Sequence, residues 1–243
     1  MSRRKRSIFK ERKKINYKLI FAVLLLMCAA VLLISYAISA IISQKDELYD
    51  QGVEYYEAGS YQEAIDSFKA ALAENQLFSK KKDQNTKLYL ADSYLKSAQY
   101  SEAADTYKEL VDSSYSGSNV KDLQELASAM EDFSMGNYGG ALDVLLKEAE
   151  KYPELYMYVG TCYAVTDDSE NMFASYEKYV QTFGFNSYVY AMYGSYYMNN
   201  GDMESSIAYI MNGLDCDDTV YRKELIMLEI TYYEKQEDYD KAY

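Results

Sequence analysis

The chain of 243 residues contains no histidine, one proline and 11 glycines, and its aromatic residues are 29 Tyr and 8 Phe without tryptophan. The missing histidine excludes Ser-His-Asp and Cys-His catalysis, HExxH zinc sites and histidine-based pH switching. So little proline and glycine favours helices joined by short turns over a β-sandwich or barrel. The formal net charge of −13 is unevenly distributed, because residues 1–18 hold nine of the 25 basic residues and only one of the 38 acidic ones.

An apolar stretch without charges follows this basic tail. Residues 19–42, LIFAVLLLMCAAVLLISYAISAII, form an uncharged run of 24 positions. As a helix the run would extend about 36 Å, enough to cross a hydrocarbon layer about 30 Å thick. The basic residues before it and the acidic segment QKDELYD after it fix the orientation by the positive-inside rule. We therefore expect a basic cytoplasmic tail at 1–18 that meets anionic lipid headgroups, a transmembrane helix at 19–42, and an extracytoplasmic region at 43–243.

Other uses of the amino-terminal segment stay open. A cleaved signal peptide has a shorter apolar core, although Ala37-Ile38-Ser39 resembles a cleavage site, and cleavage would release a secreted binding protein. A lipoprotein would need a small residue before Cys28, where Met27 stands. A buried helix of a soluble domain does not explain the nine flanking cations. The tail could also bind DNA or RNA, but its position beside the apolar run favours lipid headgroups.

A short pattern recurs along the region after residue 43. The letters GSYQEA at 59 return as AQYSEA at 98, GNYGGA at 136, GDMESS at 201 and EDYDKA at 237. Before the turns, a small residue precedes a tyrosine by three positions in the pairs Gly52/Tyr55, Ala91/Tyr94, Gly160/Tyr163 and Gly194/Tyr197. After the turns, an alanine precedes a large residue by four positions in the pairs Ala64/Phe68, Ala103/Tyr107 and Ala141/Leu145. Small residues let antiparallel helices approach closely while large ones fill the adjoining gap, so the pattern predicts helical hairpins.

The pattern resembles the tetratricopeptide repeat, a helix–turn–helix unit of 34 residues. The first unit matches best, with Leu48, Gly52, Tyr55, Gly59, Tyr61, Ala64, Phe68 and Ala71 at the family spacing. The resemblance implies an all-α fold, a right-handed superhelical solenoid of stacked helix pairs. We expect units near 45–78, 84–117, 122–152, 153–186 and 187–220, followed by an incomplete sixth from about 221. In the fourth unit Asp168 and Ser169 replace the glycine and tyrosine of the turn, and surplus residues between units are expected in loops at 75–85 and 113–120.

By analogy with this family, the first helix of each unit lines an inner, concave groove. The residues expected there are Asp46, Tyr49, Val53, Tyr56, Asn85, Leu88, Asp92, Leu95, Tyr188, Ala191, Ser195 and Met198. Tyrosine, methionine and aliphatic side chains with a few acids suit an extended peptide or an amphipathic helix of a protein partner. The family's clamp for chaperone tails needs a set of Lys, Asn and Arg residues that is absent here, so that ligand is not implied.

No catalytic, cofactor or metal site is predicted. Paired carboxylates such as Asp167/Asp168 and Asp217/Asp218 are typical of solvated helical surfaces. The segment 215–220 loosely resembles a calcium loop, but Val220 replaces the required glycine. Cys162 and Cys216 are expected to be free thiols and not a disulfide. Beyond residue 18 the chain holds 16 basic and 37 acidic residues, and this excess of negative charge excludes nucleic acid as a partner.

These observations predict a non-catalytic, membrane-anchored scaffold or assembly factor of a bacterial cell envelope, with its groove outside the cytoplasmic membrane. The alternative is an accessory part of an envelope enzyme or secretion complex whose active portion lies beyond residue 243. This alternative rests on the last letters, YEKQEDYDKAY, which stop soon after the sixth turn.

Overall fold

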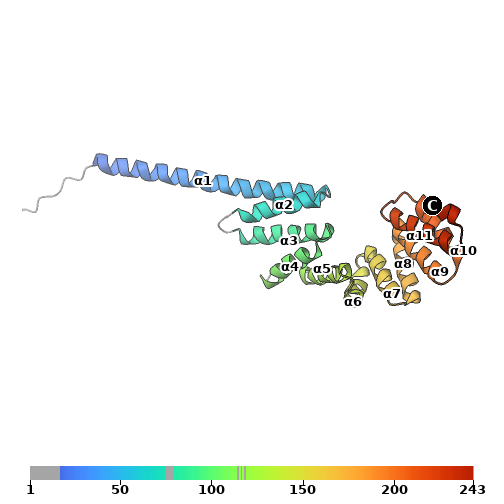
Figure 1. Cartoon of the computed structure of the whole chain (residues 1–243). Coiled ribbons are helices and arrows are strands. Elements are labelled where there is room, and N and C mark those ends of the chain that lie inside the picture. The colour runs from blue at the N-terminus through green and yellow to red at the C-terminus, as the bar shows by residue number, and fades with distance from the viewer. Residues whose placement is uncertain (1–16, 75–78, 114, 116, 118, 243) are drawn as a thin grey trace, which may run out of the picture. The chain divides into compact units, whose positions relative to one another are not determined.

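The computed structural model describes residues 17–74, 79–113, 115, 117 and 119–242, and the regular structure of that part of the chain is entirely helical (Figure 1). The expected all-α class is therefore confirmed for these residues. The chain divides into two compact units, Met1–Ser97 and Ala98–Tyr243.

The first unit contains the helices α1 (Tyr17–Glu57), α2 (Tyr61–Ala73) and α3 (Lys80–Lys96). Helix α2 packs against both α1 and α3, and α1 also contacts α3, so the carboxyl-terminal part of α1 belongs to a three-helix layer (Figure 1). Helix α1 is 41 residues long and passes without interruption through residue 43, where the expected span ends and the expected repeats begin.

The expected transmembrane helix, residues 19–42, falls in the first part of α1. Side chains are described at residues 21–37, and all of them are exposed. The remainder of the expected span and residues 1–16 of the basic tail lie outside the described side chains. Among the residues that the structure describes, no helix combines the length and the apolar character needed to cross a membrane.

The second unit consists mainly of helical hairpins. Its helices are α4 (Tyr100–Asp112), α5 (Val120–Ser134), α6 (Tyr138–Ala149), the 3₁₀ turn η1 (Pro153–Leu155), α7 (Tyr156–Val165), α8 (Ser169–Phe183), α9 (Ser187–Asn199), α10 (Met203–Asp215), α11 (Arg222–Lys235) and α12 (Tyr239–Ala242). Consecutive helices pack as the pairs α5–α6, α7–α8, α9–α10 and α11–α12, and α9 also contacts α11. The first helices of successive pairs, α9 and α11, therefore lie next to each other.

One of the two expected interunit loops is shorter than predicted. Helix α3 begins at Lys80, so residues 80–85 of the expected loop at 75–85 are helical. The run KKKDQN has a loop-like polar composition, but lysine and glutamine are good helix formers, and Asp83 lies favourably in the first turn. The expected loop at 113–120 agrees better, because α4 ends at Asp112 and α5 begins at Val120.

The turns between paired helices share one backbone geometry. In each, the second residue after the first helix has a left-handed backbone conformation. This residue is glycine at Gly59, Gly136 and Gly201, and the other turns have Ala98, Asp167 and Glu237 there. The amide of the following residue donates a hydrogen bond of 2.8 to 3.0 Å to the carbonyl five positions back at Ser60, Asn137, Asp168, Asp202 and Asp238. These bonds satisfy carbonyls that the end of a helix leaves without partners.

In the fourth hairpin this geometry shifts the expected alignment by one residue. Asp167, with a φ of 58°, takes the place of the glycine. Asp168 is instead the N-cap of α8, where its side chain accepts a hydrogen bond of 3.1 Å from the Asn171 amide. The hairpin therefore keeps the turn without a glycine in it.

The core repeats at fixed positions of the second helix in each pair. The third residue after its start is buried at Ala64, Ala103, Ala141, Met172 and Ser206, and the seventh is buried at Phe68, Tyr107, Leu145, Tyr176 and Ile210. The alanine and large residues predicted on the second helices are thus confirmed as core, and two more hairpins use the same positions with other residues. The tyrosines predicted to fill the gap from the first helices differ: Tyr94 is buried, but Tyr55, Tyr163 and Tyr197 are only half-buried.

A close approach between the two helices of a pair explains the small residues. A Cβ atom added to Gly52 or Gly160 would lie 2.5 Å from a ring carbon of Phe68 or Tyr176, respectively. The same addition at Gly194 would meet Ile210 at 2.8 Å. In each case the partner lies 16 residues later in the chain, so one spacing relates the small residue to the large one.

We expect the Gly160→Ala substitution to lower the free energy of unfolding by about 1–3 kcal/mol, because the added methyl group would clash with the fully buried Tyr176 ring. The control is Gly139→Ala in α6, where an added Cβ meets nothing within 4 Å. That substitution should leave stability unchanged or raise it by up to about 1 kcal/mol. Urea denaturation followed by circular dichroism measures both, and equal effects would contradict the close-approach explanation.

Candidate functional site

Half of the predicted groove residues of the first unit take part in contacts between α1 and α3. Asp46 on α1 forms an ion pair with Lys82 on α3. The Lys82 ammonium nitrogen lies 5.5 Å from the centroid of the Tyr49 ring, and Tyr49 makes an edge contact with Tyr89 at 6.0 Å between centroids. A cation over the face of an aromatic ring is attracted to it, so these groups hold the two helices together at one end of the predicted face.

The other end of this face is organised by Tyr56. Its hydroxyl donates a hydrogen bond of 2.6 Å to the Asp92 carboxylate on α3, and its ring makes an edge contact with Tyr89 at 5.4 Å. Burial, and then the bond to Asp92, raise the pKa of the Tyr56 phenol above its ordinary value. Tyr56 and Asp92 therefore stabilise the α1–α3 contact, whether or not they also touch a partner.

The remaining predicted residues of the first unit lie partly exposed on the same two helices. Val53 is on α1, and Asn85, Leu88 and Leu95 are on α3; all four are half-buried. The sequence interpretation omitted Tyr89, which contacts Tyr49, Tyr56 and Phe68. Its position four residues after Asn85 and three before Asp92 places it on the predicted face, and this spacing could have identified it.

In the second unit, three of the four predicted residues line one apolar hollow between α9 and α11. The hollow has a volume of about 400 Å³, and Tyr188, Ala191 and Ser195 line it together with Met192 from α9. Across it lie Tyr221, just before α11, and Glu224, Met227, Leu228 and Thr231 of α11. We call this cavity the α9–α11 hollow. The fourth predicted residue, Met198, is buried with 4% of its surface exposed and is outside the lining.

The Tyr188 side chain is fixed in this hollow by two partners. Its hydroxyl forms a hydrogen bond with the Thr161 hydroxyl of α7, and its ring makes an edge contact with Tyr221 at 4.6 Å between centroids. Burial raises the pKa of the Tyr188 phenol. The ring therefore forms a rigid, neutral wall.

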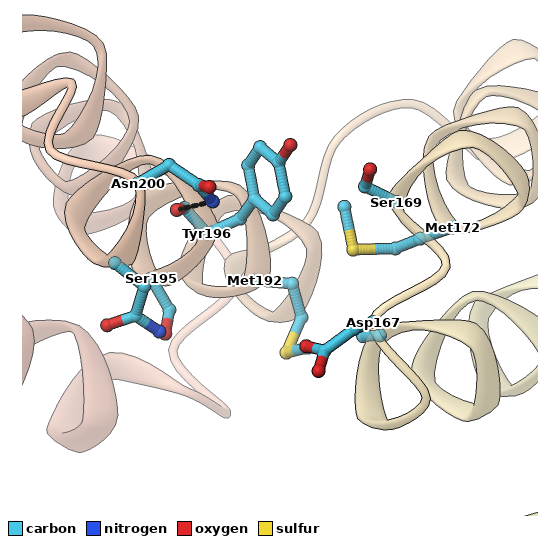
Figure 2. A pocket seen from close by; sticks show the side chains of 9 residues that line it. Asp167, Ser169, Met172, Met192, Ser195, Tyr196 and Asn200 are labelled. Atoms are coloured by element: carbon cyan, nitrogen blue, oxygen red, sulfur yellow. Dashed lines mark hydrogen bonds between the residues drawn. The ribbon is translucent and has the colours of Figure 1, made fainter.

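A second cavity adjoins the α9–α11 hollow along α9, and its lining includes one predicted residue, Ser195. It has a volume of about 390 Å³, and Figure 2 shows Tyr196, Ser195 and Asn200 facing Ser169, Met172 and Asp167 across it. Its lining also includes Met192, so Met192 and Ser195 line both cavities. We call it the turn hollow, because Asp167 belongs to the α7–α8 turn. Its lining on α7 and α9 belongs to first helices, but Asp167, Ser169 and Met172 come from the turn and the second helix, which the expectation for the groove leaves out.

The paired carboxylates have structural roles in the described part of the chain. Side-chain and backbone hydrogen bonds to Asn171 lower the pKa of Asp168, and the Val220 amide together with Ser187 lowers the pKa of Asp218. Asp218 accepts bonds of 3.0 and 2.7 Å from the Ser187 amide and hydroxyl at the start of α9. Groups held in the ionised form by such bonds are suited to capping helices and not to donating protons in catalysis.

Comparison with known proteins identifies the repeated hairpins. Residues 55–127 match the family model described as tetratricopeptide repeat. This segment therefore contains tetratricopeptide repeats. No curated protein matches the chain. Among solved structures, a thermophilic tetratricopeptide repeat protein from Thermus thermophilus is 20% identical with a TM-score of 0.44, covering 79% of this chain and 98% of that chain. A likeness this distant carries no conclusion about the present molecule.

The hairpin geometry continues beyond the matched segment. The α7–α8 and α9–α10 hairpins have the same left-handed backbone conformation in the turn, the same buried positions and the same close approach as the α1–α2 hairpin. The α9–α11 hollow therefore lies between the first helices of two successive hairpins, in the position that the family resemblance implied for a groove.

The phenols of partly and fully buried tyrosines should make the protein less stable at alkaline pH. Burial raises the pKa of Tyr158 and of Tyr193 to about 12, above the ordinary value of 10.0. Both states hold the phenolic proton below pH 10, so this contribution to stability is complete there. Between about pH 10 and 12 the unfolded chain ionises first, and we expect the free energy of unfolding to fall.

Urea midpoints measured by circular dichroism between pH 8 and 12 test this expectation. Tyr158→Phe should make the decline above pH 10 shallower than in the wild-type chain, because burial raises the pKa of the Tyr158 phenol. A wild-type midpoint that stays constant to pH 12 would contradict the prediction.

Proposed function

We propose that this chain is a membrane-anchored scaffold whose repeats bind a protein partner outside the cytoplasmic membrane. The observation that carries the binding part is the α9–α11 hollow, an open cavity lined by Tyr188, Met192, Met227 and Leu228. Met227 is 59% exposed, although an apolar side chain of this size gains about 1.5–3 kcal/mol from burial. A partner's apolar side chain in this cavity would remove both surfaces from water.

The proposed occupant is a peptide segment of another protein. The cavity is too small for a folded domain and is open to the surface, so it suits one or two apolar side chains presented by a segment that lies across the helices. Tyr188 is already held by Thr161 and Tyr221, so little side-chain entropy is lost when a ligand packs on it. In this proposal the chain has no catalytic activity of its own and acts by holding its partner.

The anchoring part of the proposal rests on α1. Apolar side chains including Phe21, Leu26 and Leu33 are between 67% and 71% exposed. A row of such side chains along one helix needs an apolar environment, and the hydrocarbon layer of a bilayer supplies one. The nine basic residues among positions 1–18 favour a cytoplasmic amino terminus, so the repeats would lie on the opposite side, in a bacterial cell envelope.

Within the first unit, α1 is joined firmly to the repeats. The Lys45 side chain is buried, forms an ion pair of 2.6 Å with Asp83 on α3, and donates a hydrogen bond of 3.0 Å to the Glu74 carbonyl. Removing one partner of a buried ion pair is strongly destabilising, so these contacts resist separation of α1 from α3. In the proposed protein the first repeat is therefore continuous with the anchor.

A comparison of two methionine positions tests the binding part. A photo-crosslinking amino acid in place of Met227, which lines the α9–α11 hollow, should form an adduct with a discrete partner in cells. The same replacement at Met211, which is 41% exposed on α10 and outside the hollow, should not. Adducts of equal yield from both sites, or from Met211 alone, would contradict the assignment of the α9–α11 hollow as the binding site.

Topology can be measured independently. Protease added outside intact spheroplasts should digest the repeat region, and the chain should stay with the membrane fraction after alkaline carbonate extraction. Replacing both Leu26 and Leu33 by arginine should release it into the soluble fraction, because each charge at the centre of a span costs about 2.5–3.5 kcal/mol. Full protection from protease would overturn the orientation, and extraction of the wild-type chain by carbonate would overturn the anchor.

A further inference from the structure

We infer that the turn hollow binds an arginine side chain of the same partner segment whose apolar residue fills the α9–α11 hollow. The inference rests on the proposed function and extends it by naming the chemistry of the partner. It starts from the shared wall: Met192 and Ser195 of α9 line both cavities, so a segment that crosses α9 can reach the two together.

The lining of the turn hollow offers each part of an arginine side chain a matching surface. Ala164, Met172 and Met192 supply apolar surface for the three methylene groups. Asp167 supplies a carboxylate, with which guanidinium forms paired hydrogen bonds. The Tyr196 ring supplies a face on which a planar guanidinium can stack.

The polar groups of the cavity are arranged to accept hydrogen bonds. The side-chain nitrogen of Asn200 donates a hydrogen bond of 2.9 Å to the Tyr196 carbonyl (Figure 2). This nitrogen is therefore already engaged, and the side-chain oxygen is left as an acceptor. Tyr196 is held by edge contacts with Phe173 at 4.8 Å and with Tyr197 at 5.5 Å between centroids. The aromatic wall is therefore fixed before a ligand arrives.

Charge favours a cationic ligand over a neutral or acidic one. Asp167 lines the turn hollow and Glu224 lines the α9–α11 hollow, and none of the described residues that line either cavity is lysine or arginine. The chain beyond residue 18 carries 37 acidic and 16 basic residues, so the surrounding field also attracts cations.

The closeness of the two cavities limits the spacing of the partner's residues. Because Met192 and Ser195 line both cavities, the cavities adjoin along α9. The width of a helix with its side chains, about 10–12 Å, is an upper limit on their separation, and an extended chain advances about 3.3 Å per residue. The partner's arginine should therefore lie within about four residues of its large apolar residue.

A peptide selection on the full 243-residue chain in detergent micelles tests this spacing. Phage-displayed random dodecapeptides selected on the chain should be enriched in arginine within about four positions of Leu, Ile, Met or Phe. One selected peptide, labelled with fluorescein, and its Arg→Gln version are then titrated by fluorescence anisotropy against the wild-type chain and three variants.

The variants separate the two cavities from general electrostatics. Asp167→Asn keeps the shape of the side chain, and asparagine also tolerates the left-handed backbone. The substitution should weaken binding of the arginine peptide about fivefold without weakening binding of the glutamine peptide. Glu237→Gln removes one negative charge at the corresponding position of the sixth turn, where φ is 59°, and should leave both affinities unchanged. Met227→Ala, at an exposed side chain that folding does not require, should weaken both peptides equally.

The outcomes distinguish failure of this inference from failure of the proposed function. Selected peptides without arginine, or equal losses from Asp167→Asn and Glu237→Gln, would overturn the arginine assignment. If Met227→Ala still weakens binding of the selected peptides, the proposed binding function stands although the arginine assignment is wrong. If no peptide is selected, or if neither Met227→Ala nor Asp167→Asn changes affinity, both the proposed binding function and the arginine assignment are wrong.

Discussion

The contact between a small residue on one helix and a buried large residue 16 positions later is the constraint on which the hairpins depend. At Gly52, Gly160 and Gly194 the two helices come so close that even a methyl group would overlap the partner side chain. A single spacing of this kind fixes the separation, the register and the rotation of both helices at once, because packed interiors leave no room for an alternative. The faces that remain outside this contact are then free to differ from one hairpin to the next.

The turns show how the same geometry tolerates different residues. A left-handed backbone costs alanine or glutamate about 1–2 kcal/mol relative to glycine, yet Ala98 and Glu237 adopt it. The hydrogen bond from Asp238 to the Tyr233 carbonyl and the burial of Ala242 both follow from this turn, so tertiary contacts offset the local cost. For Asp167 the substitution has a second consequence: a residue that replaces glycine brings a carboxylate to the edge of a cavity.

Packing residues within one hairpin could be predicted from the sequence. Contacts that depend on how helices of different hairpins are rotated relative to each other could not. Gly52 and Phe68 could each be recognised as packing residues because both lie in one short, repeated hairpin. The bond between Tyr56 and Asp92 could not, because it joins the first helices of different pairs and depends on how α1 and α3 are rotated. Met198 was placed in the groove by analogy with the family, but in the structure it is buried and lies outside the hollow. The start of α3 at Lys80 was missed because polar residues suit an exposed helical turn as well as a loop.

The tyrosines have two structural roles, and both follow from the same hairpin geometry. A tyrosine at the seventh position of a second helix, such as Tyr107 or Tyr176, is fully buried and fixes the hairpin. Tyr56 and Tyr188, on first helices, are instead half-buried and have their rings packed against a neighbouring aromatic ring. Because an aromatic ring offers a large contact area with only two side-chain torsions, residues of this second kind can both join successive hairpins and present a preformed surface to a ligand. Recognition by such a surface is coupled to the packing of the solenoid itself, so a partner that binds across α9 and α11 would also stabilise the contact between the two hairpins.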